Sequence, residues 1–305
     1  MTNKDINYKK SLSSIWTDSL INNQEPDDKA LLDHLRTVHR HNAGFTEKCA
    51  SICRDKARRN SYEWLAEIVP NIDGIRVLDL ACGSGPLLKI LYDRNKKLRL
   101  KGVDMCPEEL ALAKARLPDS VVDLFELKAQ KLTAIDDNSI DVVLCHWALT
   151  LMNPITPVLN EIRRVLSLGG RFGALVNGPM DAAPGYSDVY NLIYENVQAK
   201  LPKYGEIDLG DPRIRNTDSL KHLLNEAFPD AKVNIETNVV TMEGPVAEVA
   251  ETAAGFFYAS FILPSHTRKT MLSKLSNLLT ISKQNRHFER LGSFTMPINR
   301  IVIRK

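Results

Sequence analysis

The stretch Val77-Leu78-Asp79-Leu80-Ala81-Cys82-Gly83-Ser84-Gly85-Pro86 decides the fold class of this chain. Its first four residues are mostly apolar, which predicts a short buried strand. The glycines that follow predict a tight turn in which a ligand can lie against bare main chain. Pro86 is typical of the first turn of a helix, which Leu87, Leu88 and Leu91 continue. A strand, a ligand-binding turn and a helix are therefore expected in immediate succession.

The same alternation of strand and helix continues on the carboxyl side of this stretch. Strands are expected over residues 98–103, 121–127, 140–145, 171–177, 231–241 and 297–303. Helices are expected over residues 107–116, 159–166, 218–228, 246–261 and 267–290, the second of them ended by Gly169-Gly170. Strands that alternate with helices and are apolar along their length predict an α/β fold with a parallel sheet covered on both faces.

Changes in the spacing of apolar residues and in the frequency of Gly and Pro predict four parts of the chain. Apolar residues at helical spacing before residue 70 predict a helical N-terminal lid, and several Gly and Pro residues after Asn177 predict an insertion. The expected parts are 1–70 as the lid, 71–177 as the core, 178–230 as an inserted cap and 231–305 as the last part of the core sheet with a helical insertion.

Composition excludes several classes of protein. Hydrophobic residues make up 44% and charged residues 25% of the 305 residues, which is typical of a globular domain. Lys and Arg outnumber Asp and Glu only by 40 to 37, so we expect no nucleic-acid partner. No apolar run approaches the length that spans a bilayer, and five cysteines suggest reduced thiols. We therefore expect a cytoplasmic protein with no membrane partner.

An acid after the glycine-rich turn predicts a nucleoside site. Asp104 closes the next expected strand, about 20 residues downstream of the turn, where a carboxylate can accept hydrogen bonds from both ribose hydroxyls. Nicotinamide-binding loops usually carry a third small residue, at the position that Leu88 occupies here. Asp79 also stands four residues before the first glycine. These features favour a nucleoside cofactor other than a nicotinamide dinucleotide.

At this point the sequence resembles the class I S-adenosylmethionine-dependent methyltransferases. Their first motif has the form acid-x-x-x-Gly-x-Gly, and their second strand ends in an acid. The resemblance covers residues 76–177 and continues through Ala129-Gln130, the strand from Asn138 to Cys145, the segment His146-Trp147-Ala148-Leu149 and the turn and strand from Arg164 to Phe172. Members of the family often have an acid near Gln130, which this chain lacks.

The resemblance implies a Rossmann-like, doubly wound and mostly parallel sheet that binds S-adenosyl-L-methionine. The residues expected to contact this cofactor are Asp79, Ala81, Gly83, Gly85, Asp104, Met105, Ala129, Gln130 and Cys145. No metal is required, because the methyl group is already electrophilic on its sulfonium. His39, His41, Cys49 and Cys53 do not have the spacing of a standard zinc site, so we expect no metal.

Aromatic and polar residues are the candidates for contact with the molecule that accepts the methyl group. His146 is the candidate catalytic base, and the alternative is that it only packs or bonds locally. Tyr8, Trp16, Trp147, Tyr186 and Tyr190 are candidate acceptor contacts, with Tyr194 continuing the helical spacing of the last two. Aromatic residues at such positions more often pack in a core, so both readings stay open.

The function expected from these features is transfer of a methyl group to an O or N atom of a small metabolite or natural product. No Asn-Pro-Pro-Tyr follows the fourth expected strand and no Pro-Cys nucleophile is found, and both absences favour a small acceptor over nucleic acid. Two alternatives remain: a non-catalytic module that binds S-adenosylmethionine or another nucleoside, and a nicotinamide-dependent oxidoreductase. A homodimer is compatible with the sequence, which does not specify the oligomeric state.

Overall fold

The computed structural model describes residues 13–118, 121–205, 209–284 and 290–305, and the chain forms two compact units. The first unit comprises Met1–Cys49, Pro184–Ile207 and Thr241–Thr295. The second comprises Ala50–Ala183, Asp208–Val240 and Met296–Lys305. Residues 50–70 and 208–230, which the sequence assigned to the lid and the cap, therefore cluster with the sheet, and the roles of lid and cap stay predictions.

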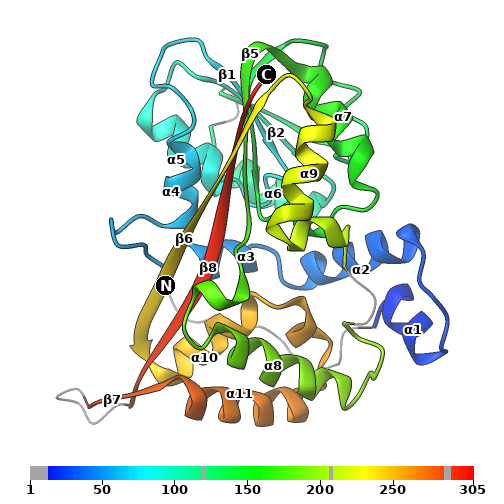
Figure 1. Ribbon diagram of the computed structural model, residues 1–305, viewed down its shortest axis with the longest axis vertical. Coiled ribbons are helices and arrows are strands. Elements are labelled where there is room, and N and C mark those ends of the chain that lie inside the picture. The colour runs from blue at the N-terminus through cyan, green and yellow to red at the C-terminus, as the bar shows by residue number, and fades with distance from the viewer. Residues whose placement is uncertain (1–12, 119–120, 206–208, 285–289) are drawn as a thin grey trace. The chain divides into compact units, whose positions relative to one another are not determined.

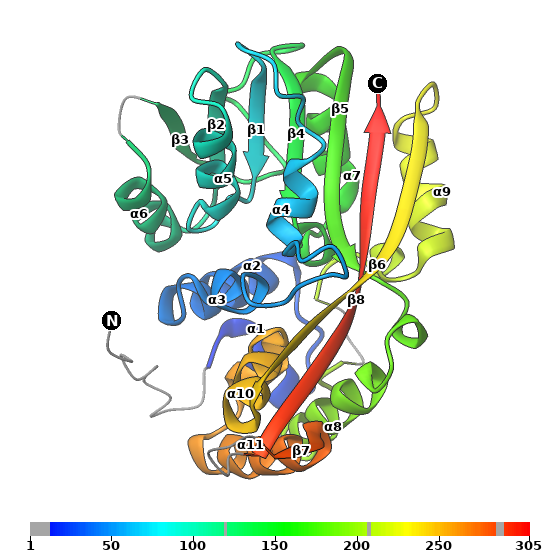
Figure 2. The ribbon, with the colours of Figure 1, turned by 90° about the vertical axis from the view of Figure 1, so that its left-hand side faces the viewer.

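The second unit is built on a mixed, mostly parallel sheet. Its parallel strands are β1 (Arg76–Leu80), β2 (Arg99–Asp104), β3 (Val122–Glu126), β4 (Ile140–His146) and β5 (Leu166–Asn177). The strand order is β3-β2-β1-β4-β5-β8-β6, as Figure 2 shows, with β8 (Arg290–Arg304) antiparallel to β5 and β6 (Lys232–Pro245) beside β8. The predicted doubly wound α/β sheet is confirmed.

Helices cover both faces of this sheet. Those of the second unit are α4 (Ser61–Ala66), α5 (Pro86–Arg94), α6 (Pro107–Arg116), α7 (Ile155–Val165) and α9 (Thr217–Ala227). Figure 1 shows α4 and α5 on one face and α7 and α9 on the other. Every side chain at Ile155, Val158, Leu159, Ile162 and Val165 is buried, which is the helical spacing of an apolar stripe that packs on a sheet.

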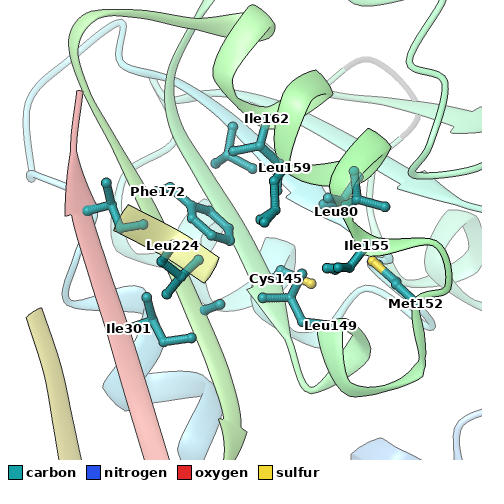
Figure 3. Close-up of a cluster of buried hydrophobic side chains, with 14 of the residues drawn as sticks. Leu80, Cys145, Leu149, Met152, Ile155, Leu159, Ile162, Phe172, Leu224 and Ile301 are labelled. Atoms are coloured by element: carbon teal, nitrogen blue, oxygen red, sulfur yellow. The ribbon is translucent and has the colours of Figure 1, made fainter. Parts of the chain in front are cut away.

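The main core of the second unit lies between the sheet and helices α7 and α9. Figure 3 shows Cys145 of β4, Phe172 of β5 and Leu224 of α9 within one buried cluster. The apolar strands β1, β4 and β5 contribute to it because side chains on both of their faces are covered. This packing holds the carboxyl ends of the strands, where ligands bind in open α/β sheets, on a rigid support.

The first unit is mainly helical. It contains α1 (Ile15–Ile21), α2 (Asp28–His41), α8 (Tyr186–Gln198), α10 (Val246–Gly255), α11 (Ser265–Leu279) and most of α3 (Phe45–Ala50), and β7 (Thr280–Gln284) pairs with the start of β8. A short 3-10 helix, Tyr258–Ile262, also belongs to this unit, and three others belong to the second unit, at Ala148–Leu151, Met180–Ala182 and Pro212–Arg215. Within the described ranges, no helix has the length and apolar character needed to cross a membrane.

Several predicted boundaries were wrong, among them those of three helices. Helix α7 ends at Val165, and Gly169-Gly170 lies inside β5, where a shift of register between β4 and β5 accommodates it. Helix α11 ends at Leu279, because the β-branched Thr280 pairs with Gly292 of β8 instead. The helix predicted over 246–261 ends at Gly255 and is followed by a 3-10 turn. In the first two cases pairing with a neighbouring strand overrode a local helical preference.

Candidate active site

The turn after β1 has an unusual backbone. Ala81, Gly83 and Gly85 all have positive φ, of 58°, 52° and 77°. The turn is closed by hydrogen bonds from the Cys82 amide to the Val103 carbonyl at 2.9 Å and from the Gly85 amide to the Cys82 carbonyl at 3.0 Å. Glycine adopts this left-handed conformation without steric cost, so the sequence allows the main chain to double back directly into α5. Strand order reverses between β1 and β4, so this turn lies at the switch point where ligands bind.

Asp104 ties the turn to the end of β2. Its carboxylate accepts hydrogen bonds from the Gly83 amide at 2.8 Å and from the Cys106 amide at 2.9 Å, one on each oxygen. A carboxylate has about four lone-pair sites, so it can accept more hydrogen bonds than the two that the main chain donates. The predicted ribose acid is therefore already oriented by the main chain on both sides.

Asp79 lies in β1 with only 1% of its surface exposed. Its Oδ1 atom is buried and has no hydrogen-bond partner among the residues that the structure describes. Burial raises the pKa of Asp79 well above its usual range, and the neighbouring Asp104 carboxylate raises it further. A buried carboxyl oxygen that lacks a partner is costly, and a cationic or hydrogen-bonding ligand would remove that cost. This observation fits a bound cofactor with an ammonium group.

The thiols near the turn are poor nucleophiles, because burial keeps them protonated. Burial, with a smaller effect of Asp79, raises the pKa of Cys145 to about 12. Burial also raises the pKa of Cys82 well above its usual range. Only the thiolate is an effective nucleophile, so these side chains act as apolar walls. Cys145, predicted as a cofactor contact, is fully buried in the core cluster.

Three further predicted cofactor contacts lie in loops that are joined by a backbone hydrogen bond. Met105 follows β2, and Ala129 and Gln130 lie in a turn after β3; all three are half-buried. The Leu127 amide donates to the Asp104 carbonyl at 3.0 Å, which connects the two loops. These three side chains therefore lie at the same edge of the sheet as Asp104.

His146 is the last residue of β4 and therefore lies at the carboxyl edge of the sheet. Its side chain is 8% exposed, and its Nε2 atom is 2.9 Å from the Ser61 hydroxyl. The imidazole stacks on the Tyr62 ring, with 3.7 Å between centroids and 18° between planes, and meets the Trp147 ring edge-on. Burial lowers the pKa of His146 to about 3, so the ring is neutral at physiological pH.

Two residues of this group were missed by sequence reasoning. Ser61 and Tyr62 begin α4, whose start is held by reciprocal hydrogen bonds between Asn60 and Glu63. That capping box was a readable signal for the start of a helix. No local pattern could show that the first turn of α4 packs on a histidine 85 residues away.

Glu109 was also missed. It lies in the first turn of α6 and is only 3% exposed, although carboxylates are rarely buried. A Cβ atom built on Gly83 would lie 3.8 Å from its Oε2 atom. Three carboxyl groups, those of Asp79, Asp104 and Glu109, therefore surround the turn.

The predicted acceptor contacts divide between the two units. Trp147 lies beside His146, with a positive φ of 60°. Trp16 belongs to the first unit, where it is 1% exposed and packs against His34 and Tyr204. Tyr186 and Tyr190 belong to the same unit and pack around Phe257. Tyr8 lies outside the described residues, so the role of these aromatic residues stays a prediction.

Comparison with known proteins agrees with this geometry. Residues 78–174 match the family model described as a methyltransferase domain. The chain is 30% identical over 137 residues to demethylmenaquinone methyltransferase of Deinococcus radiodurans, a match that covers 45% of this chain and 55% of that protein. The enzyme of the same name from Thermus thermophilus is 27% identical over 175 residues, which cover 56% of this chain and 74% of the relative.

The fold has solved counterparts. Phosphoethanolamine N-methyltransferase 2 of Haemonchus contortus, solved with phosphomonomethylethanolamine and S-adenosylhomocysteine, superposes with a TM-score of 0.52 and 14% identity. The superposition covers 92% of this chain and 62% of that one. The chain spans about half the length of the Deinococcus relative, so the match describes the domain and not a whole activity. Sheet order, turn geometry and matched motifs agree: residues 78–174 form a methyltransferase domain of the class I S-adenosylmethionine-dependent kind, with S-adenosylmethionine as its cofactor.

Proposed function

We propose that this protein transfers a methyl group from S-adenosylmethionine to an O or N atom of a small-molecule acceptor. The observation that carries the proposal is the polar cluster at the switch point: a left-handed turn, an oriented Asp104 carboxylate and a buried Asp79 oxygen that lacks a partner. This arrangement supplies the hydrogen-bonding groups that a nucleoside with a charged amino-acid tail requires.

Each part of the turn has a distinct role in holding the cofactor. Asp104 would accept hydrogen bonds from the ribose hydroxyls, and Asp79 would pair with the ammonium group, whose charge would lower the raised pKa of that carboxyl. The main chain at Ala81, Gly83 and Gly85 would lie against the amino-acid tail. Met105, Ala129, Gln130 and Cys145 would border the adenine and the sulfur. When bound, the cofactor supplies an electrophilic methyl group on a sulfonium.

His146 and Trp147 would lie next to the acceptor. Both follow Cys145 at the carboxyl end of β4, and the adjacent β1 runs parallel and ends in the cofactor turn. Because the methyl group is already activated, the chain has chiefly to position the acceptor in line with it, and His146 would orient the acceptor or take its proton.

The acceptor we propose is a compact, partly aromatic molecule that carries oxygen. The name of the Deinococcus and Thermus relatives, demethylmenaquinone methyltransferase, supports a quinone-type compound as the first to test. Tyr8, Trp16, Tyr186 and Tyr190 remain our proposed acceptor contacts, contributed by the predicted lid and cap. We further expect a cytoplasmic protein, with a homodimer as its candidate oligomer and without nucleic-acid or membrane partners.

The experiment that tests this proposal combines binding with turnover. Calorimetry with S-adenosylmethionine, S-adenosylhomocysteine and NAD should show binding of the first two only. A panel of quinols, phenols and amines should then be screened for S-adenosylhomocysteine release, with the methylated atom of each product assigned by NMR. The His146→Ala variant should lose turnover while keeping its cofactor affinity.

Each alternative has its own outcome in these measurements. Binding of NAD with no binding of S-adenosylmethionine would support an oxidoreductase and contradict the proposal. Tight binding of S-adenosylmethionine with no product from any acceptor class would support a non-catalytic module. A product methylated only on carbon would correct the proposed acceptor atom while leaving the cofactor assignment in place.

A further inference from the structure

The hydroxyl of Ser61 has one hydrogen-bond partner in the described part of the chain, the Nε2 atom of His146 at 2.9 Å. The side chain is not needed at the end of its own helix, because Asn60 and Glu63 cap α4 between them. Ser61 is 1% exposed, so water does not readily replace this contact. The pair is therefore a dedicated contact between α4 and the end of β4.

The direction of this hydrogen bond follows from the cost of burying a donor. If Ser61 only accepted a hydrogen bond from Nε2, its own hydroxyl hydrogen would be buried without an acceptor, which costs about 1–3 kcal/mol. If Ser61 donates to Nε2, the hydrogen is satisfied and only an oxygen lone pair is left over. Donation is the cheaper arrangement, and Nε2 then holds no hydrogen. In a neutral imidazole the hydrogen must in that case reside on Nδ1.

Two aromatic contacts fix the orientation of the His146 ring, and burial keeps the ring neutral. The Tyr62 ring stacks at 3.7 Å on the imidazole, and Trp147 meets its edge at 4.9 Å between centroids, so rotation of the ring is restricted. Among the residues that the structure describes, burial alone accounts for the lowering of the His146 pKa to about 3. The ring is thus held neutral, and its Nδ1 atom has no hydrogen-bond partner among the described residues.

From this geometry we infer that Ser61 is a positioning residue that holds His146 as the Nδ1–H tautomer, so that His146 donates a hydrogen bond to the acceptor and does not act as a base. The consequence for the acceptor rests on the proposed function. An N–H donor at this place suits a molecule with a carbonyl or phenolate oxygen close to the atom that is methylated. The proton of a neutral acceptor would then leave to solvent.

The tautomer can be measured without any acceptor. Nitrogen-15 NMR of protein labelled at its seven histidines distinguishes protonated from unprotonated ring nitrogens, and His146→Gln identifies the signals of His146. We expect the wild-type protein at pH 7 to carry hydrogen on Nδ1 alone. In Ser61→Ala the two tautomers should interconvert, and Ser61→Thr, which retains the hydroxyl, should restore the wild-type pattern.

Ser260→Ala is the matched control, because Ser260 is also fully buried and donates to a backbone carbonyl, that of Ala254, in the other unit. It should leave the His146 signals unchanged. With an acceptor in hand, Ser61→Ala should lower kcat about tenfold, the equivalent of one hydrogen bond, without changing the KM for the cofactor. A folded Ser61→Thr protein that fails to restore the wild-type pattern would contradict the role of the hydroxyl, so the thermal unfolding of this variant is measured in parallel.

Hydrogen on Nε2 in the wild-type protein, or an unchanged tautomer in Ser61→Ala, would overturn the inference. A kcat that rises with pH through a single ionisation removed by His146→Gln would also overturn it, because a base must lose its proton to act. If the tautomer is as expected but no acceptor is methylated, the inference about Ser61 stands and the proposed function fails.

Discussion

Replacement of Asp104 by alanine tests the cofactor site most directly. The Asp104 carboxylate accepts hydrogen bonds from the Gly83 and Cys106 amides, and we expect it to accept two more from the ribose of S-adenosylmethionine. Removing it therefore affects both the folded turn and the bound nucleoside. The two effects are separable, because one is measured without ligand.

The magnitudes follow from the partners that are lost. The Cys106 amide is buried, so its loss of an acceptor should lower the free energy of unfolding by about 1–3 kcal/mol, whereas the half-buried Gly83 amide can turn to water. Two charge-assisted bonds to the ribose are worth about 1.5–3 kcal/mol each, and water recovers part of this. We expect a net loss of about 3 kcal/mol, which raises Kd roughly 100-fold. Asp104→Asn keeps one acceptor oxygen and should raise Kd by about tenfold.

Calorimetry with S-adenosylhomocysteine and thermal unfolding are the two measurements. Asp123→Ala is the control, because Asp123 is an exposed carboxylate on the neighbouring β3 that pairs with Lys101 at 3.0 Å. It should change neither quantity appreciably. A folded Asp104→Ala protein that binds the cofactor with wild-type affinity would refute the assignment of Asp104 to the ribose.

Three further predictions concern the turn, the N-terminal segment and the buried His34. Gly83→Val places a β-branched residue at a φ of 52° and should raise the Kd for the cofactor at least about tenfold. Gly74→Val is the control: it is strained at a φ of 79°, but its Cβ would have no atom within 4 Å, so it should lower stability without affecting the Kd. Equal Kd values for the two variants would place the cofactor elsewhere. Deletion of residues 1–25 should abolish turnover, measured as S-adenosylhomocysteine release, but spare cofactor affinity measured by calorimetry, and full turnover would exclude a lid role for this segment. Burial lowers the pKa of His34 to about 4 from a usual 6.5, so the folded state binds fewer protons than the unfolded state between these values. The difference corresponds to about 3 kcal/mol of folding stability, which is present above pH 6.5 and lost as the pH falls toward 4. Denaturant unfolding should show a smaller loss over this pH range in His34→Asn than in the wild-type protein, because His146, whose pKa is also lowered, contributes to the loss in both; parallel pH profiles would contradict the prediction.

The sequence by itself determined the sheet and the turn that we propose as the cofactor site. Residues 77–88 predicted strand, turn and helix because apolar runs, glycines and an early proline each act on the local backbone. Asp79, Gly83, Gly85 and Asp104 could be singled out because the turn and the end of the second strand must meet at one edge of a parallel sheet. The structure places these residues there, with the Gly83 amide bound to Asp104.

The tertiary structure alone decided the state of the side chains. Ser61 and Tyr62 contact His146 across 85 residues of chain, and only that packing determines which nitrogen of the ring is engaged. The missing partner of Asp79 and the raised pKa of that carboxyl arise from desolvation, which depends on every neighbour at once. Trp16 and Tyr186, predicted as acceptor contacts, are buried within their unit by aromatic partners distant in sequence. Local patterns specify backbone geometry, whereas burial, protonation and pairing are properties of the assembled core, since they depend on which segments come together.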